Sequence, residues 1–222
     1  MVAPAWAIPS TSPNVLIAVS AIGPVSYEWA CNYADIWERR PAGTSRMRLP
    51  PYVIDQSRET GAETAVGNRF KWIFFLDSDV LPPPDVINRL IAHNKPIVSG
   101  FYSRRHPPIY PLLLRKTSDN PIKFDLIRDF TPGTLVEVDA CPAGCMLVST
   151  DALRKIPKPW FYWSSGRAID GVGEDYFFTQ KAQMIGFKVY VDTAMKCRHK
   201  GDFLILPRDD LGYEIMGESP NP

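Results

Sequence analysis

Two carboxylates, Asp77 and Asp79, stand one residue apart directly after the apolar run Trp72–Leu76. A short apolar run of this kind predicts a strand that is covered on both faces. Two acidic groups at the end of a buried strand are costly unless a positive charge lies with them. Their oxygens suit Mg²⁺ or Mn²⁺, ions that often carry substrate phosphates as well. An Asp-Ser-Asp turn that simply faces water is the alternative.

Three further features stand near the ends of predicted elements and could join this site. His199 follows a predicted strand late in the sequence, and Mn²⁺ accepts one imidazole beside carboxylates. Glu174 and Asp175 open a predicted helix, where an acid either stabilises the first turn or serves as a general base toward an attacking hydroxyl. The aromatic segment 160–163 either belongs to the core or packs against a sugar ring.

Cationic side chains near the same elements could neutralise phosphate groups. Arg58, Arg198 and Lys200 are the candidates, although a single basic residue is most often a surface charge. Ser20 ends a predicted strand that passes through a small-residue turn into a helix. This order of elements is how open α/β sheets present a nucleotide site. The glycine-rich fingerprint GxGxxG of dinucleotide-binding proteins is absent from this turn.

The elements that must position these residues alternate between strand and helix. We expect strands at 15–20, 52–55, 72–76, 97–102, 135–138, 145–149 and 188–191. We expect helices at 27–39, 59–67, 151–155 and 174–185, capped at Ser26 for the first and Thr150 for the third, and one that starts at Pro84 or Asp85. Such alternation predicts a mainly parallel sheet. The basic segment 104–129 interrupts it and is expected to hold an edge hairpin or an inserted loop.

Composition limits the class of protein. A chain of 222 residues with a net charge of +1 is long enough for a sizeable core, and its charge favours neither nucleic acid nor an anionic membrane as a partner. No apolar stretch is long enough to cross a bilayer, and the N-terminus lacks the features of a signal peptide, so we expect a cytoplasmic protein. We interpret the four cysteines as free thiols, with a Cys141–Cys145 or Cys31–Cys197 bridge left open.

Taken together, the motifs resemble those of GT-A-fold glycosyltransferases, particularly the family 2-like enzymes. The resemblance is spread from residue 15 to residue 201. The matching segments are the first strand Val15–Ser20, the segment Ser57–Gly61 with Ala65 and Gly67, the DXD motif in Phe75–Asp79, Asp139 with Gly144–Leu147, the Glu-Asp motif in Gly173–Phe178, and Gly186–Tyr190 with His199-x-Gly201. Glu59 departs from the family pattern, which has asparagine there, and residues 68–71 lengthen the link to the central strand.

The resemblance implies a role for each matching residue. Asp79 and His199 would bind the metal and therefore lie close enough to share one ion, and Asp77 would contact the donor ribose, or the metal through water. Asp175 would be the catalytic base of an inverting displacement, with Glu174 as the second candidate. The cofactor-binding set would also include Ser20, Arg58, Arg198 and Lys200.

The sequence therefore predicts a single GT-A domain over 1–222, with a Rossmann-like, mixed but mainly parallel sheet flanked by helices. Residues 1–13 would form an N-terminal arm, and the tail 202–222 would drape over the surface as a possible lid. The expected activity is transfer of a sugar from a UDP- or GDP-linked donor to the hydroxyl of a carbohydrate or other acceptor, with Mn²⁺ or Mg²⁺. Acceptor contacts are expected in segments 104–115 and 160–163.

Three alternatives remain open from the sequence. A retaining GT-A transferase would carry the same metal pair. A sugar nucleotidyltransferase would normally have a glycine-rich, basic phosphate loop after the first strand, whereas segment 20–24 has one glycine and no cation. A non-catalytic nucleotide- or sugar-binding module would bind such ligands without turnover. The donor sugar, the nucleobase, the acceptor and the oligomeric state are not specified by the sequence.

Overall fold

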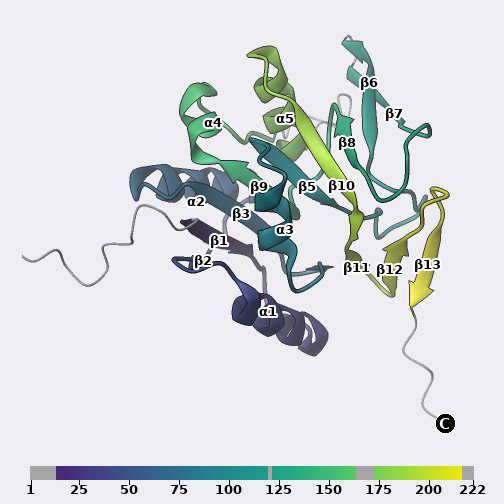
Figure 1. Ribbon diagram of the computed structural model, residues 1–222, viewed down its shortest axis with the longest axis horizontal. Helices are drawn as coiled ribbons and strands as arrows, with labels where there is room; N and C mark the ends of the chain where they lie inside the picture. The colour runs from purple at the N-terminus through teal and green to yellow at the C-terminus, as the bar shows by residue number, and fades with distance from the viewer. Residues whose placement is uncertain (1–13, 120–121, 164–172, 217–222) are drawn as a thin grey trace, which may run out of the picture.

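A seven-stranded mixed sheet forms the centre of the computed structural model, which describes residues 14–119, 122–163 and 173–216 (Figure 1). The strand order is β2-β1-β3-β9-β5-β10-β8. Their bounds are β1 Val15–Ser20, β2 Ser45–Arg48, β3 Trp72–Asp77, β5 Ile97–Phe101, β8 Leu135–Val138, β9 Cys145–Ser149 and β10 Val189–Lys196. Only β9 and β8 run against the other five strands. The predicted α/β class with a mainly parallel, Rossmann-like sheet is confirmed.

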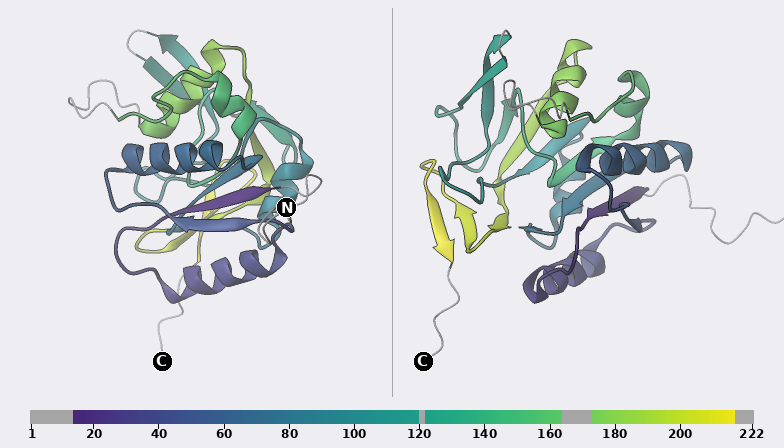
Figure 2. Two further views of the ribbon diagram at one scale, coloured as in Figure 1. Left: turned by 90° about the vertical axis from the view of Figure 1, so that its left-hand side faces the viewer. Right: turned by 180° about the vertical axis from the view of Figure 1, so that it is seen from behind.

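Helices cover both faces of this sheet (Figure 2). α1 (Tyr27–Arg39) and α3 (Val86–Ala92) contribute buried side chains to the core on one face. α2 (Ile54–Gly67), α4 (Thr150–Lys155) and α5 (Glu174–Met184) contribute theirs to the core on the other face. A sheet buried between two helical layers requires apolar residues on both faces of its central strands, as the unbroken apolar runs of β1 and β3 provide.

Successive residues of the central strand divide between the two cores. Phe74 and Leu76 of β3 pack with α1 and α3, whereas Ile73 and Phe75 pack with α2, and all four are fully buried. Because each such side chain stabilises the fold by about 1.5–3 kcal/mol on burial, β3 is fixed firmly. The two carboxylates that follow it therefore start from a rigid support.

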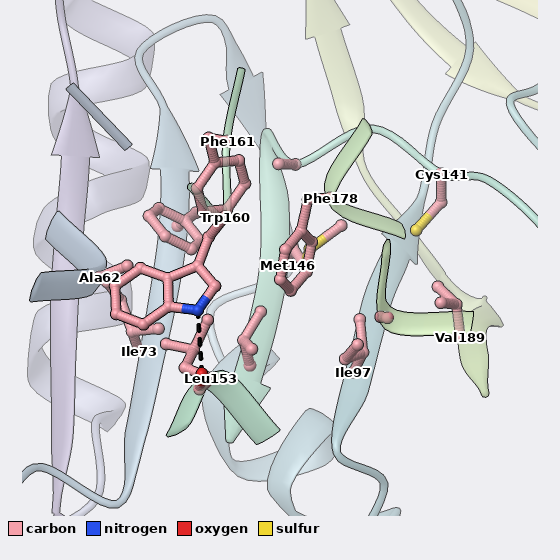
Figure 3. Close-up of a cluster of buried hydrophobic side chains, with 14 of the residues drawn as sticks. Ala62, Ile73, Ile97, Cys141, Met146, Leu153, Trp160, Phe161, Phe178 and Val189 are labelled. Atoms are coloured by element: carbon pink, nitrogen blue, oxygen red, sulfur yellow. Dashed lines mark hydrogen bonds between the residues drawn. The ribbon is translucent and has the colours of Figure 1, made fainter. Parts of the chain in front are cut away.

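The second core also contains part of the aromatic segment (Figure 3). Trp160 and Phe161 are 3% and 2% exposed, and the Trp160 indole donates hydrogen bonds to the carbonyls of Leu153 and Ile156, both at 2.9 Å. Phe161 stacks on Phe178 of α5. We had expected acceptor contacts in segment 160–163, but these two side chains belong to the core and are not available to an acceptor. Residues 164–172 lie outside the described residues.

A second, smaller sheet lies beyond the C-terminal ends of β3 and β10, with strand order β13-β12-β11-β4 (Figure 1). Its strands are β4 Val80–Leu81, β11 Arg198–Lys200, β12 Leu204–Pro207 and β13 Tyr213–Met216. The tail predicted as irregular from residue 202 thus contains two strands, and the strand predicted at 188–191 extends to Lys196. Within the segment 104–129, β6 (Leu114–Asp119) and β7 (Ile122–Leu126) form a hairpin, one of the two arrangements expected there.

The second predicted strand, at 52–55, was wrong, because residues 54 and 55 begin α2 and residues 52 and 53 precede it. The strand lies earlier, at Ser45–Arg48, and α2 begins at Ile54 after Val53. Tyr52 and Val53 are residue types that are common in strands, but both are 57% exposed here. Proline removes a backbone N–H donor, so the pair at 50 and 51 ends pairing with β1 before those residues.

Helix caps follow the sequence with one change. Ser26 caps α1 as predicted, with its hydroxyl accepting from the Trp29 amide at 3.2 Å, and Asp85 is the N-cap residue of α3. The cap of α4 is Ser149 rather than Thr150, whose hydroxyl donates instead to the Phe70 carbonyl. All four cysteines are free thiols. None of the described helices is long and apolar enough to span a membrane.

Candidate active site

Pairing between β4 and β11 brings His199 beside the Asp77–Asp79 turn. The register sets Arg198 opposite Leu81 and His199 opposite Val80, and the Lys200 amide donates to the Asp79 carbonyl at 2.7 Å. His199 Nε2 then lies 3.7 Å from Asp79 Oδ2. Two ligands that each sit about 2.1 Å from one ion can be this far apart, so the pair has the spacing to share a small divalent cation.

The tautomer of His199 suits metal binding. Its Nδ1 lies 2.7 Å from the Ser103 carbonyl oxygen, which can only accept a hydrogen bond. Nδ1 must therefore carry the proton, and Nε2 directs a lone pair toward Asp79. Burial lowers the pKa of His199 by more than its hydrogen bond to the Ser103 carbonyl raises it, and the charge of Arg105 acts with burial, so the neutral ring is favoured.

Two protein ligands are all that the geometry supplies. Across 14–119, 122–163 and 173–216, no three or more His, Cys, Asp or Glu side chains gather in a group that could hold a metal ion. Magnesium, and chemically similar manganese, often bind through one or two protein groups plus substrate phosphates and water. Asp79 and His199 fit a cation that is completed by a phosphorylated ligand.

Arg58 joins the Asp77 turn to the start of α5. Its Nη2 lies 2.9 Å from Asp77 Oδ2, its Nε lies 2.9 Å from Glu174 Oε1, and its Nη1 donates to the Ala143 carbonyl at 3.1 Å. The side chain is only 3% exposed. Although burial of the guanidinium opposes its charge, Asp77 and Glu174 raise its pKa and keep it charged. We had expected Arg58 to face a phosphate, but each of its nitrogens instead donates to a protein oxygen.

Arg58 pairs with Asp77 and Glu174, and the neighbouring Asp175 forms no ion pair within the described residues. Burial raises its pKa to about 7, and the neighbouring Glu174 contributes in the same direction, while Arg58 and a hydrogen bond from the Tyr176 amide oppose the shift. The charge of Asp77 also reaches Asp175 and raises its pKa. An acid with a pKa near neutrality is well matched to proton transfer at physiological pH.

A glycine allows the turn to pack closely. A Cβ at Gly144 would lie 2.7 Å from the Tyr102 hydroxyl and 2.9 Å from Asp77 Oδ2, so any larger residue would displace one of them. The Gly144 amide lies 2.8 Å from the same hydroxyl, and the Tyr102 ring makes an edge contact with His199 at 5.2 Å between centroids. Sequence reasoning selected Gly144 but missed Tyr102, which reads as an ordinary strand residue.

The remaining predicted site residues lie around this centre. Ser20 ends β1 directly opposite Asp77 in the parallel register, and its carbonyl accepts from the Ser78 amide at 2.9 Å. Arg198 and Lys200 line a cavity of about 580 Å³ between α1 and the small sheet. The Lys200 ammonium pairs with Glu28 of α1 at 2.8 Å. Of the three basic residues predicted for the site, Arg198 and Lys200 border open space, whereas Arg58 is buried.

A second cavity, of about 510 Å³, opens where β1 and β2 end. Trp29 and Tyr33 of α1 stack with their ring centroids 5.1 Å apart, and both line this cavity together with Arg46 and Arg48. The Trp29 indole donates to the Asp77 carbonyl at 3.0 Å, which ties the cavity to the DXD turn. These residues were not predicted; the available signal was the aromatic i, i+4 spacing in the first helix.

Arg105 is a further residue that the sequence did not single out. Its Nη1 forms an ion pair with Asp79 Oδ2, the oxygen that also faces His199. Arg105 lies in the basic segment 104–129, so the signal was a cluster of cations whose target could not be known. The structure thus puts a guanidinium against the proposed metal ligand.

Comparison with known proteins supports the fold alone. No protein-family model matches the chain, and no curated protein matches it. A solved structure titled "Crystal Structure of A197 from STIV" aligns with a TM-score of 0.61 at 17% identity, over 94% of this chain and 97% of that one. An apo UDP-glucose pyrophosphorylase aligns over 84% of this chain and 76% of its own, at 13% identity. Its TM-score of 0.44 is too low to support a statement about fold or function.

Proposed function

We propose that this protein is a single-domain, metal-dependent glycosyltransferase that moves a sugar from a nucleoside diphosphate donor to an acceptor hydroxyl with inversion. One observation carries the proposal. Asp79 and His199 face each other beyond the end of β3, and Arg58 links the same turn to the start of α5, where the pKa of Asp175 is raised to about 7. This is the set of groups that the DXD, His-x-Gly and Glu-Asp motifs imply for a GT-A enzyme.

The donor would lie across the ends of β1 and β3. Asp79 and His199 would hold Mn²⁺ or Mg²⁺, and the bound ion would stabilise the negative charge that develops on the leaving diphosphate. The cavity lined by Trp29 and Tyr33 offers aromatic faces for the nucleobase. Asp77 would orient the ribose, because Arg58 fixes its carboxylate in place. Arg198 and Lys200 border the adjacent cavity and would add positive charge beside the phosphates.

Asp175 would take the proton from the acceptor hydroxyl. A base must be ionised to accept a proton and gains most when its pKa lies near the working pH, and the raised pKa of Asp175, about 7, supports this role. Glu174 is less suited to that role because its side chain is 9% exposed and its carboxylate is paired with Arg58. Arg58 is then a positioning residue that links the donor side to the base.

The test is release of UDP or GDP from a panel of UDP- and GDP-sugars, with Mn²⁺, with Mg²⁺ and with EDTA. We expect metal-dependent release that falls by at least about a hundredfold in Asp79→Ala, since removing a main source of transition-state charge stabilisation costs several kcal/mol. Binding of nucleotide without release would favour a non-catalytic module. The anomeric configuration of the product, read by NMR, separates inversion from retention.

A further inference from the structure

Asp79 faces two groups that compete for one carboxylate oxygen. Arg105 Nη1 pairs with Oδ2, and His199 Nε2 lies 3.7 Å from the same atom. A cation shared by Asp79 and His199 would have to lie against that oxygen. The guanidinium of Arg105 and such a cation therefore occupy overlapping space and carry charge of the same sign. This inference rests on the proposed function.

Three other cations near the turn have partners of their own. The Lys200 ammonium pairs with Glu28 at 2.8 Å, and Arg58 is held between Asp77 and Glu174. Arg104 directs its Nη1 to the Tyr110 hydroxyl at 3.3 Å. Arg105 is thus the guanidinium that the described residues present to Asp79.

The backbone around Arg105 is anchored by its neighbours, whereas its side chain is held by the ion pair with Asp79 and by a hydrogen bond from Nε to His106 Nε2 at 3.1 Å. The loop is anchored at its base by the Ser103 carbonyl on His199 Nδ1 and by the Arg104 amide on the Tyr110 carbonyl at 3.0 Å. The Arg105 carbonyl would lie 3.0 Å from a Cβ at Gly201, a close approach that glycine permits. The Arg105 side chain is 41% exposed. It can therefore change partner by rotating its side chain, with the loop in place.

We propose that Arg105 serves two partners in turn: Asp79 in the free protein and the diphosphate of the donor in the complex. A metal ion that binds without the donor must break the Arg105–Asp79 pair, and this cost lowers the affinity for the metal. A nucleoside diphosphate supplies a new anion for the released guanidinium, so each ligand strengthens binding of the other. By linkage, the factor must be the same in both directions. Arg105 thereby makes metal and donor binding cooperative.

The experiment measures Mn²⁺ affinity from the EPR signal of free Mn²⁺, without nucleotide and with saturating UDP or GDP. The proteins are wild type, Arg105→Gln and Arg104→Gln, which removes the same charge one residue away. We expect Arg105→Gln to bind Mn²⁺ roughly 3- to 30-fold more tightly without nucleotide, as loss of one nearby cation predicts. Nucleotide should then increase its Mn²⁺ affinity less than it does in wild type. Arg104→Gln should stay within about twofold of wild type.

Two results would overturn the proposal. One is an unchanged Mn²⁺ affinity in Arg105→Gln, and the other is an equal change in Arg104→Gln, which would show only a general charge effect. Asp79→Asn separates this failure from failure of the proposed function. If Mn²⁺ binding survives in that variant, the metal does not bind at Asp79, and both proposals fall. If Asp79→Asn abolishes binding but Arg105→Gln has no effect, only the exchange of partners by Arg105 is excluded.

Discussion

The two carboxylates that open α5 differ in what their neighbours leave them free to do. Glu174 forms a buried ion pair with Arg58. Breaking such a pair by removing one partner typically costs about 3–5 kcal/mol of stability. Asp175 receives hydrogen bonding from the backbone amide of Tyr176 at 2.8 Å but has no cation of its own. One residue thus maintains structure, and the other keeps a carboxyl group with a pKa near neutrality.

Asp175→Asn should remove turnover and its pH dependence together. Because the base must be ionised, wild-type kcat should be constant above pH 8 and fall about tenfold per pH unit below the pKa of about 7. The variant should lose roughly 10²- to 10⁴-fold in kcat while its nucleotide affinity changes little. A pH–rate profile from pH 5 to 9 checks both statements. A variant that keeps wild-type turnover would assign the base elsewhere.

The same substitution should stabilise the protein at high pH. The pKa of Asp175 is about 7 in the folded protein against an ordinary 3.8, so the folded state binds this proton more tightly. Its contribution is fully present below pH 3.8 and is lost as pH rises through 7. At pH 8, Asp175→Asn should raise the free energy of unfolding by on the order of 2 kcal/mol. The gain should shrink toward pH 5, measured by urea unfolding.

Asp35→Asn is the matched control for that comparison, because Asp35 is an exposed aspartate on α1. An exposed carboxylate has little to gain from losing its charge, so its unfolding free energy should change by less than about 0.5 kcal/mol at either pH. Equal stabilisation in both variants would mean that net charge, rather than burial of Asp175, sets the effect.

Among the elements, the β6–β7 hairpin lies beside the proposed base. The Phe124 ring of β7 contacts the ring of Tyr176, the residue after Asp175, with centroids 5.4 Å apart. Phe124 also lines a cavity of about 470 Å³ together with Tyr110, Asp125 and Arg128. Aromatic rings beside polar groups suit a ligand that has both apolar faces and hydroxyls.

Phe124→Ala should therefore weaken binding of the acceptor and leave binding of the donor unchanged. We expect the acceptor KM to rise roughly five- to fiftyfold, the range for lost apolar contact in a pocket, while the Kd for UDP or GDP stays constant. Steady-state kinetics and isothermal titration measure the two quantities. Lys123→Ala, an exposed neighbour on the same strand, is the control. A weaker Kd for the nucleotide in Phe124→Ala would place the hairpin on the donor side instead.

The elements also show where sequence reasoning stops. The apolar runs at 15–20 and 72–76 and the capped helix at 27–39 were predicted correctly, because burial on two faces and helical capping leave local marks. The strand β2 was missed because it is an edge strand with alternating exposed arginines and no apolar run. The strand β13 was missed because it is exposed at every position, so that only its pairing with β12 defines it.

At the scale of the whole molecule, the site depends on contacts that no local pattern encodes. The sequence could suggest that Asp79 and His199 belong together, but their meeting requires β11 to pair with β4 across about half the chain. The three partners of Arg58 are likewise 19, 85 and 116 residues away in sequence. Arg58, predicted to bind phosphate, is instead buried between Asp77 and Glu174. The contact of Arg105 with Asp79 is not marked by any motif in the sequence.

This long-range assembly predicts that ligand binding will be visible in the melting temperature. Under the proposed function, UDP or GDP at about 100 times its Kd with Mn²⁺ should stabilise the folded state by about 2.7 kcal/mol, which is about 5–10 °C for a chain of this size. Nucleotide alone and Mn²⁺ alone should each give much smaller shifts, because each lacks the other's ligands. Differential scanning fluorimetry with and without EDTA makes the measurement.

His199→Ala and His93→Ala form the matched pair for that experiment. His93 closes α3 and bonds to Asp192 at 3.0 Å, so its loss should lower the melting temperature without removing the shift caused by Mn²⁺ and nucleotide. His199→Ala should remove most of that shift, because the cation loses one of its two protein ligands while the core on both faces of the sheet stays intact. If His199→Ala kept the full shift and His93→Ala lost it, metal and nucleotide would have to bind near α3, and the site at the end of β3 would need another explanation.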